Sequence, residues 1–185
     1  MQSKIIPGLL DNSIEFFNHS GELKYISNGI VKDFNEASIS VIMILKEVLS
    51  KSPEAKLILM DWYPDSEFNQ LKKFASCRFG GVDYTPDLVE NNLQDGEYWP
   101  CPLRGSCIGE GKVCKSPKYN GHELSKIDIE LIKLTTTDST NEVIAEKLGL
   151  PLGTFHKHKL NLYQKLGNLQ TKQCVTKVAY HLNII

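Results

Sequence analysis

Four cysteines carry the most specific chemistry in this sequence. Five residues separate Cys101 from Cys107, six separate Cys107 from Cys114, and Cys77 lies upstream of all three. Four thiolates are the number that closes a tetrahedral zinc site or holds an iron–sulfur cluster. We therefore expect a metal centre on these residues, either zinc or iron–sulfur, and keep free thiols as the alternative.

The residues around the cysteines bear on this expectation. Basic side chains lie nearby and would lower the pKa of the thiols; they are Arg104, Lys112, Lys115 and Lys118. No Cys-x2-Cys pair is present, although zinc ribbons and ferredoxin-type motifs normally contain one. Residues 82–118 are rich in Pro, Gly and Asn, and a loop of this length needs something besides core burial to order it. A bound centre would supply that order.

A cysteine could also serve as the nucleophile of an enzyme. His19 or His122 would then be the base. The sequence places neither histidine near a cysteine, and it contains no G-x-S-x-G, H-E-x-x-H or phosphate-binding glycine loop. We therefore expect a protein that is not an enzyme.

Length and composition suit one mid-sized domain or two small ones. The chain has 185 residues, 41% hydrophobic and 23% charged, which is close to a globular average. The longest apolar run, Val41 to Leu45, is too short to span a bilayer or to form the core of a secretion signal. We expect a cytoplasmic protein without a membrane segment, a setting in which five cysteines stay reduced or bind metal.

The expected fold class is α+β, with a mixed α/β domain over 1–120 and an all-α domain over 121–185. In the first domain a turn signal at His19 to Gly21 predicts a hairpin, and the remaining elements are a helix over 31–49, a strand over 56–61 and a helix over 65–76. The stretch from Pro117 to His122 resembles a linker. Four helices are expected in the second domain, over 125–136, 139–148, 153–166 and 170–182.

Charge separates the two domains as well. Residues 121–185 carry 8 Lys and Arg against 6 Asp and Glu, and the last 35 residues hold five lysines and no carboxylate. Such a segment can approach phosphates without competing acids, although a solvated helix face would look the same.

The third helix of this domain has two different faces. At 100° per residue, Phe155, Leu162 and Leu166 lie on one side, and polar and basic residues lie on the other. A tight turn over 150–153 joins it to the helix before it. Two helices joined in this way, the second with a basic outer face, are the parts of a helix-turn-helix.

The same region resembles the four-helix DNA-binding domain of LuxR-type (GerE- or NarL-type) transcription regulators. The similarity covers about a third of the chain and runs without a gap. The residues that carry it are Leu124-Ser125, Asp128, Glu130, Thr140-Asn141, Ile144 to Leu150, Thr154, His158, Asn161-Leu162-Tyr163, Lys165 to Gly167, Gln173 and Val175. The resemblance implies a cytosolic bacterial regulator that binds double-stranded DNA. It also implies that the third helix reads the major groove and that helix 170–182 pairs two copies as a homodimer.

The DNA-binding residues expected on this basis are Thr154, His156, Lys157, Lys159, Leu160, Asn161, Gln164 and Lys165. Lys157, His156 and then Asn161 are the candidates for base edges, and Leu160 could contact only an apolar group such as a thymine methyl. Thr154, Lys159 and Lys165 are expected at phosphates. His158 lies near the buried side and is expected to pack.

Three residues depart from the family pattern, Pro151, Ile127 and Leu160; the last stands at a groove-facing position where the family often carries Lys or Ser. Pro151 stands where the family usually has a capping side chain, so the third helix is expected to begin near Thr154. Ile127 stands where the family commonly has an arginine. Cys174 occupies a place where the family favours alanine, which suggests packing or a subunit contact.

Two other classes of protein remain as alternatives. Leu57 to Asp61, followed by Pro64, is similar to the strand and phosphate-accepting aspartate of receiver domains. The acidic pair and the lysine that accompany such an aspartate are not found in the sequence. The N-terminal domain could instead be a protein-interaction module that brings a partner protein to the DNA; its aromatic residues, including Trp62 and Trp99, permit this.

Overall fold

The computed structural model describes residues 5–169, 171–182 and 184–185, and it combines helices with small antiparallel sheets. The chain divides into two compact units, Met1–Lys115 and Ser116–Ile185. The division falls slightly before the expected boundary at 120/121. Within the described residues, every helix is too short or too polar to cross a bilayer.

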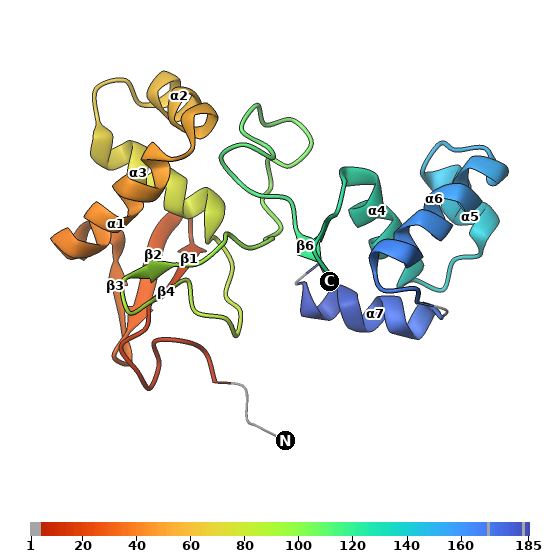
Figure 1. Ribbon diagram of the computed structural model, residues 1–185, viewed down its shortest axis with the longest axis horizontal. Coiled ribbons are helices and arrows are strands. Elements are labelled where there is room, and N and C mark those ends of the chain that lie inside the picture. The colour runs from red at the N-terminus through yellow and green to blue at the C-terminus, as the bar shows by residue number, and fades with distance from the viewer. Residues whose placement is uncertain (1–4, 170, 183) are drawn as a thin grey trace. The chain divides into compact units, whose positions relative to one another are not determined.

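The N-terminal unit begins with a three-stranded antiparallel meander. The strands are β1 (Glu15–His19), β2 (Glu22–Ser27) and β3 (Ile30–Asp33), in the order β1-β2-β3 (Figure 1). Both turns have two residues with positive φ, Ser20-Gly21 and Asn28-Gly29, as tight hairpin turns require. The hairpin expected at His19 to Gly21 is therefore confirmed.

Three helices follow the meander. They are α1 (Ile39–Ser50), α2 (Pro53–Trp62) and α3 (Glu67–Arg78), and α3 packs against β1 and β2. Ser38 and Ser66 cap α1 and α3, because their hydroxyl groups accept hydrogen bonds from the amides of Val41 and Asn69.

One expected element in this unit is confirmed in part, and another is wrong. The helix expected over 31–49 begins only at Ile39, because the Asn28-Gly29 turn sends the preceding residues back along β2 as a third strand. The strand expected over 56–61 is part of α2. Pro53 occupies the first turn of this helix, and Ala55 and Leu59, four residues apart, are its buried side chains.

The core of the N-terminal unit lies between the sheet and the helices. Phe16 of β1 is fully buried, and its ring contacts the rings of Phe34 and Phe79. The segment after α3 forms one short hairpin, β4 (Leu88–Val89) with β5 (Asn92–Leu93). It is otherwise a loop, as expected, and Val113 anchors it in the core with no exposed surface.

The C-terminal unit opens with a hairpin of β6 (Lys118–Tyr119) and β7 (His122–Glu123), where a linker was expected; Asn120 and Gly121 form its turn. Helices α4 (Lys126–Thr135), α5 (Asn141–Lys147), α6 (Leu152–Lys165) and α7 (Lys172–His181) follow (Figure 1). They correspond to the four helices expected, with shifted ends. Gln170, the expected first residue of the last helix, lies outside the described residues.

Caps and turns explain these helix ends. Ser125 and Asp128 form a capping box on α4, and Thr140, rather than the expected Ser139, caps α5. Gly149, with φ of 65°, ends α5. Pro151 provides no side-chain cap to α6, as expected, yet the helix begins at Leu152 and not near Thr154, because proline suits the start of a helix.

Candidate functional site

The outer face of α6 is the first candidate site, and it has the distribution of side chains that the sequence indicates. Phe155, Leu162 and Leu166 are buried in the C-terminal unit. Successive residues of a helix are 100° apart, so the exposed residues that follow share one side of about 140°. They are His156, Lys157, Leu160, Asn161 and Gln164.

This face carries no acidic group from its own helix, and its central apolar side chain is open. Leu160 is 60% exposed, and no Asp or Glu occurs between Pro151 and Ile185. Thr154 is also exposed, one turn nearer the start of the helix, whereas His158 is only half exposed. The surface therefore offers donors, acceptors and one positive charge to a ligand. The acidic group near it is Glu142 of α5, whose charge interacts with His156.

Two of the expected phosphate contacts are engaged inside the unit. Lys159 is half-buried, its ammonium group donates to Oδ1 of Asn141 at 2.9 Å, and it lies over the rings of Phe155 and Tyr163. Lys165 forms an ion pair of 2.7 Å with Asp128 and also donates to the carbonyl of Glu123. Both lysines join α6 to other parts of the same unit.

Helix α7 has an exposed stripe of its own. Gln173, Lys177 and Tyr180 are exposed at spacings of four and three residues, so they lie on one side of the helix. Tyr180 is 66% exposed, an unusual state for an aromatic ring. Cys174 lies beside the stripe, half-buried, and its amide donates to Oγ1 of Thr171.

The second candidate site is a cavity in the N-terminal unit. Its volume is about 240 Å³, and all four expected metal ligands, Cys77, Cys101, Cys107 and Cys114, line it. The structure thus brings together side chains that are up to 37 residues apart in the sequence. None of the five cysteines of the chain forms a disulfide.

Two helices and a loop build this cavity. Lys73 and Cys77 lie four residues apart on α3 and so share a side of that helix, and Trp62 ends α2. The loop contributes the other three cysteines through a series of tight turns. Backbone hydrogen bonds close these turns, and they run from the amides of Arg104, Cys107 and Glu110 to the carbonyls of Cys101, Leu103 and Cys107, respectively.

Several contacts hold the loop against the helices. The indole of Trp99 donates to the carbonyl of Cys77 at 3.1 Å, and Nε of Arg78 donates to the carbonyl of Val113 at 2.8 Å. Gly109 packs so closely that a Cβ atom there would lie 2.7 Å from the ring of Trp62. Core burial through Val113 therefore shares in ordering this loop.

Burial dominates the protonation of Cys77. It raises the pKa of this thiol to about 11, and the neighbouring cysteines add to the rise while Lys73 opposes it. The expectation that basic neighbours lower the thiol pKa is thus wrong for Cys77, because loss of solvent outweighs one ammonium group. Of the basic residues named from the sequence, Lys115 pairs with Asp95 instead.

Two other interpretations of the sequence, a cysteine enzyme and a receiver domain, require particular arrangements of side chains. No histidine is among the described residues that line the cavity, so the thiols have no imidazole base there. Asp61 lies within α2 and not at the end of a strand, which removes the geometry that a receiver-type aspartate needs.

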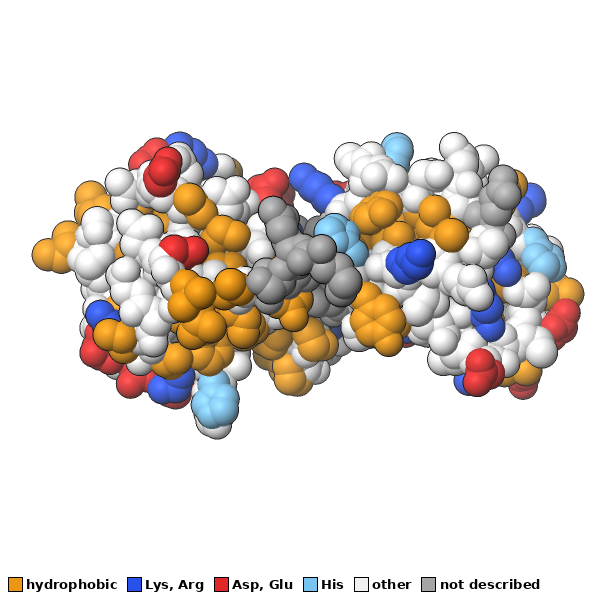
Figure 2. Space-filling view, turned by 90° about the horizontal axis from the view of Figure 1, so that it is seen from below, with side chains coloured by type: hydrophobic (Ala, Val, Ile, Leu, Met, Phe, Trp, Pro, Cys, Tyr) orange, Lys and Arg blue, Asp and Glu red, His pale blue; other side chains and the backbone are white. Residues whose placement is uncertain are grey.

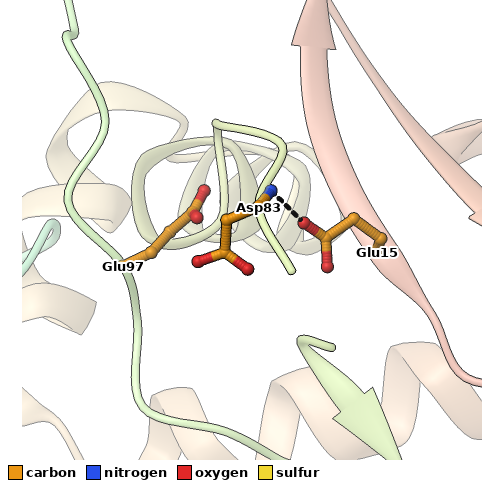
Figure 3. A group of neighbouring side chains, drawn as sticks. All are labelled: Glu15, Asp83 and Glu97. Atoms are coloured by element: carbon orange, nitrogen blue, oxygen red, sulfur yellow. Dashed lines mark hydrogen bonds between the residues drawn. The ribbon is translucent and has the colours of Figure 1, made fainter. Parts of the chain in front are cut away.

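A third group, which sequence reasoning missed, consists of carboxyl groups. Oxygen atoms of Glu15, Asp83 and Glu97 lie within 4.8 Å of one another (Figure 3). Glu15 has no exposed surface; its Oε1 accepts from the amide of Asp83 at 2.8 Å, while its buried Oε2 has no partner among the described residues. The nearby Asp87 accepts from the amide of Phe16 at 2.7 Å.

Burial and repulsion between neighbouring carboxylates favour the protonated forms of Glu15, Glu97 and Asp87. Burial, with the charges of Asp83 and Glu97, raises the pKa of Glu15 to about 8, and burial raises the pKa of Glu97 to about 7. The pKa of Asp87 also lies well above its usual range. The cluster therefore retains protons near neutral pH.

Hydrophobic side chains also gather on one face of the N-terminal unit, as Figure 2 shows. Leu9, Leu10, Ile30 and Val31 are all exposed by 45% or more. The amide of Gly29 bonds to the carbonyl of Gly8, which holds the two segments next to each other. We refer to these four residues as the apolar patch.

Comparison with known proteins adds no family to these observations. The chain matches no family model, no curated protein and no solved structure.

Proposed function

We propose that this protein is a DNA-binding transcription regulator, in which α5 and α6 form a helix-turn-helix and α6 enters the major groove. The observation that carries the proposal is the outer face of α6. Its exposed residues are those that would meet base edges if the LuxR-type resemblance holds, and the tight Gly149 turn supplies the connection between the two helices.

Roles follow from exposure and from existing bonds. Lys157, His156 and Asn161 are exposed, and we assign them to base edges, with Gln164 beside them and Leu160 against a thymine methyl. Thr154 is assigned to phosphate. Lys159 and Lys165 would reach phosphate only by exchanging their bonds to Asn141 and Asp128.

The exposed stripe on α7 suggests how two copies would assemble. Tyr180, with Gln173 and Lys177 beside it, would pack against the same stripe of a second copy. A homodimer formed in this way places two copies of α6 on one side of a duplex, and the operator would then have two-fold symmetry.

The proposal is tested by selecting duplexes from a random library with the full-length protein in buffer of low salt. We expect an enriched symmetric sequence, and an affinity that falls steeply as salt is added because lysine meets phosphate. Lys157→Ala should abolish enrichment, while Lys56→Ala, which removes an exposed lysine of α2, should not. Absence of binding to any duplex in dilute buffer would overturn the proposal.

A second candidate function, protein interaction by the N-terminal unit, is favoured by the apolar patch. Large hydrophobic side chains left exposed close together in a fold can mark an interaction surface. If the patch binds a second copy of the chain, Ile30→Asp combined with Val31→Asp should convert dimers into monomers in light-scattering measurements at low concentration. If the mass of the double variant is unchanged, the apolar patch does not form the dimer contact, and α7 is the remaining candidate.

A further inference from the structure

The cavity that the cysteines line is wider than a zinc site. With Zn–S bonds of about 2.3 Å, tetrahedral ligation brings four sulfur atoms to within about 3.8 Å of one another. Among the described residues, one set of three side chains of the types that bind metals has donor atoms within 4.8 Å of one another. This set is Glu15, Asp83 and Glu97, and it contains no cysteine. No three of the four cavity cysteines therefore approach as zinc requires.

An occupant of several atoms fits this arrangement better than a single ion. A [4Fe–4S] cluster is held by four cysteine thiolates, and its cube of iron and sulfide keeps them further apart than one zinc ion does. The cavity has a volume of about 240 Å³. A closed zinc site has no use for such a space.

The walls of the cavity suit a cluster in a second respect. Trp62, Trp99 and Leu103 line it, and an apolar shell limits the access of solvent and oxidants to a metal centre. Both tryptophans of the chain belong to this wall.

Two cationic side chains, Lys73 and Arg104, and one carboxylate, Glu110, line the cavity, and this balance of charge favours an anionic occupant. Arg104 lines the cavity, and its guanidinium is fixed by a bond from Nε to the carbonyl of Trp99 and by stacking on Tyr98. Its buried Nη2 atom has no partner among the described residues, so an N–H group remains for a sulfide or thiolate. The amide of Gly109 already donates to Sγ of Cys107 at 3.3 Å.

We propose that Cys77, Cys101, Cys107 and Cys114 bind a [4Fe–4S] cluster in this cavity, with Arg104 and Lys73 offsetting its negative charge. The cluster site stands on the geometry of the N-terminal unit alone. Its regulatory meaning, a redox or oxygen signal passed to the DNA reader, rests on the proposed function.

The experiment uses the full-length protein purified without oxygen and then incubated with ferric iron, sulfide and a thiol, which supplies the two electrons that four ferric ions need to form a [4Fe–4S]²⁺ cluster. We expect about four iron and four sulfide ions per chain after removal of unbound metal. A broad visible absorption band should appear, and the fluorescence of Trp62 and Trp99 should be quenched because both side chains touch the cavity. Zinc content should remain negligible.

Matched variants locate the cluster. Cys101→Ser, Cys107→Ser and Cys114→Ser should each lose the band and most of the iron, whereas Cys174→Ser, which alters the one cysteine outside the cavity, should keep both. Circular dichroism before reconstitution separates loss of the cluster from loss of the fold. If a serine variant does not fold, Arg104→Gln provides a second measurement, and we expect it to release iron faster in air.

Three results would overturn the inference: one tightly bound zinc per chain without sulfide, reconstitution that the cavity variants leave intact, or no metal at all. The two proposals fail separately. A cluster in a protein that binds no duplex would refute the DNA-binding function, and duplex binding by a protein that never holds iron would refute the cluster.

Discussion

The ammonium group of Lys165 lies 2.7 Å from Oδ2 of Asp128, so the end of α6 is tied to the first turn of α4. The same oxygen accepts hydrogen bonds from the amide and the hydroxyl of Ser125, which caps α4. Asp128 is only 4% exposed. One carboxylate thus completes a helix cap and anchors the proposed recognition helix.

Asp128→Asn is expected to destabilise the C-terminal unit by about 1–3 kcal/mol, because buried donors lose a charged acceptor. Far-UV circular dichroism during urea unfolding measures the change. Glu130→Gln is the matched control; it removes the exposed pair with Lys133 and should cost no more than about 0.5 kcal/mol. Equal effects of the two variants would contradict the structural role of Asp128.

The same carboxylate gives the C-terminal unit a sensitivity to acid. Burial alone would raise the pKa of Asp128, but bonds from Lys165 and Ser125 lower it below the ordinary value of 3.8. Because the pKa of Asp128 is lower in the folded state than in the unfolded state, the ionised carboxylate stabilises the fold fully at a pH above the unfolded-state pKa. This stabilisation is lost as the pH falls through the folded-state pKa. Unfolding at pH 5 and pH 2.5 should show a smaller difference between Asp128→Asn and the unmodified protein at pH 2.5.

Lys157→Ala and Lys165→Ala should have different effects on DNA. Lys157 is exposed and makes no hydrogen bond or ion pair to the described residues. Its loss should therefore weaken the free energy of binding to the selected sequence by about 1–3 kcal/mol and change binding to random duplexes little. Lys165→Ala should mainly lower the stability of the unit. Fluorescence anisotropy on both duplexes, alongside thermal unfolding, separates the two effects. Equal losses on both duplexes for both variants would reject these roles.

The carboxyl cluster should make the N-terminal unit less stable as pH rises. The folded pKa of Glu15 is raised to about 8 and that of Glu97 to about 7, both above the ordinary value of 4.5. The folded state therefore holds protons that the unfolded chain releases, and stability falls between about pH 4.5 and pH 8. Tryptophan fluorescence follows this unit alone, because Trp62 and Trp99 both belong to it.

Glu15→Gln tests the origin of that dependence. The amide is neutral at every pH, so the variant should unfold at a higher temperature than the unmodified protein at pH 8 and show a flatter profile. Glu54→Gln, which changes an exposed carboxylate of α2 outside the group of Glu15, Asp83 and Glu97, is the control. A profile that Glu15→Gln leaves unchanged would assign the pH dependence to other groups.

Gly109→Ala is expected to disturb the cysteine cavity. The new methyl group would lie 2.7 Å from the ring of Trp62 and 3.1 Å from Cγ2 of Val113, and overpacking of this kind typically costs about 1–3 kcal/mol. Tryptophan-detected unfolding measures the loss, and iron content after reconstitution should fall with it. Gly153→Ala, where a methyl group would meet nothing within 4 Å, should leave both unchanged.

Tyr180→Glu should weaken DNA binding without touching α6. Paired copies of α7 would lose the packing of two aromatic rings and place two carboxylates there instead, so we expect dimers to separate and affinity for a symmetric operator to fall more than affinity for a half-site. Analytical ultracentrifugation and anisotropy provide the two measurements. Val143→Glu adds a carboxylate at an exposed site of α5 and should leave the oligomeric state unchanged.

Local signals predict much of this fold. The Ser20-Gly21 turn, the Ser125 cap and the Gly149 stop each act within a few residues, and the elements that they delimit lie close to where the sequence places them. The run from Leu57 to Met60 was misleading because an apolar stretch without alternation fits a strand or a helix. The better signals were Pro53 at the helix start and the spacing of Ala55 and Leu59.

Contacts between distant residues account for most of what the sequence did not reveal. No spacing connects Glu15 with Asp83 and Glu97, and their proximity depends on how the loop after α3 returns to β1. The bond between Lys165 and Asp128 joins two helices in the same way. The four cavity cysteines were the exception, because their chemistry suggested a common site before any contact was known.

Cys114 is the next-to-last residue of the N-terminal unit, and Ser116 opens the unit that carries α6. Its neighbour Val113 has no exposed surface and belongs to the core of the N-terminal unit. The backbone that carries the last of the four cavity thiols is therefore positioned by core packing. Any change of bonding at the Cys114 sulfur takes place two residues before the second unit begins.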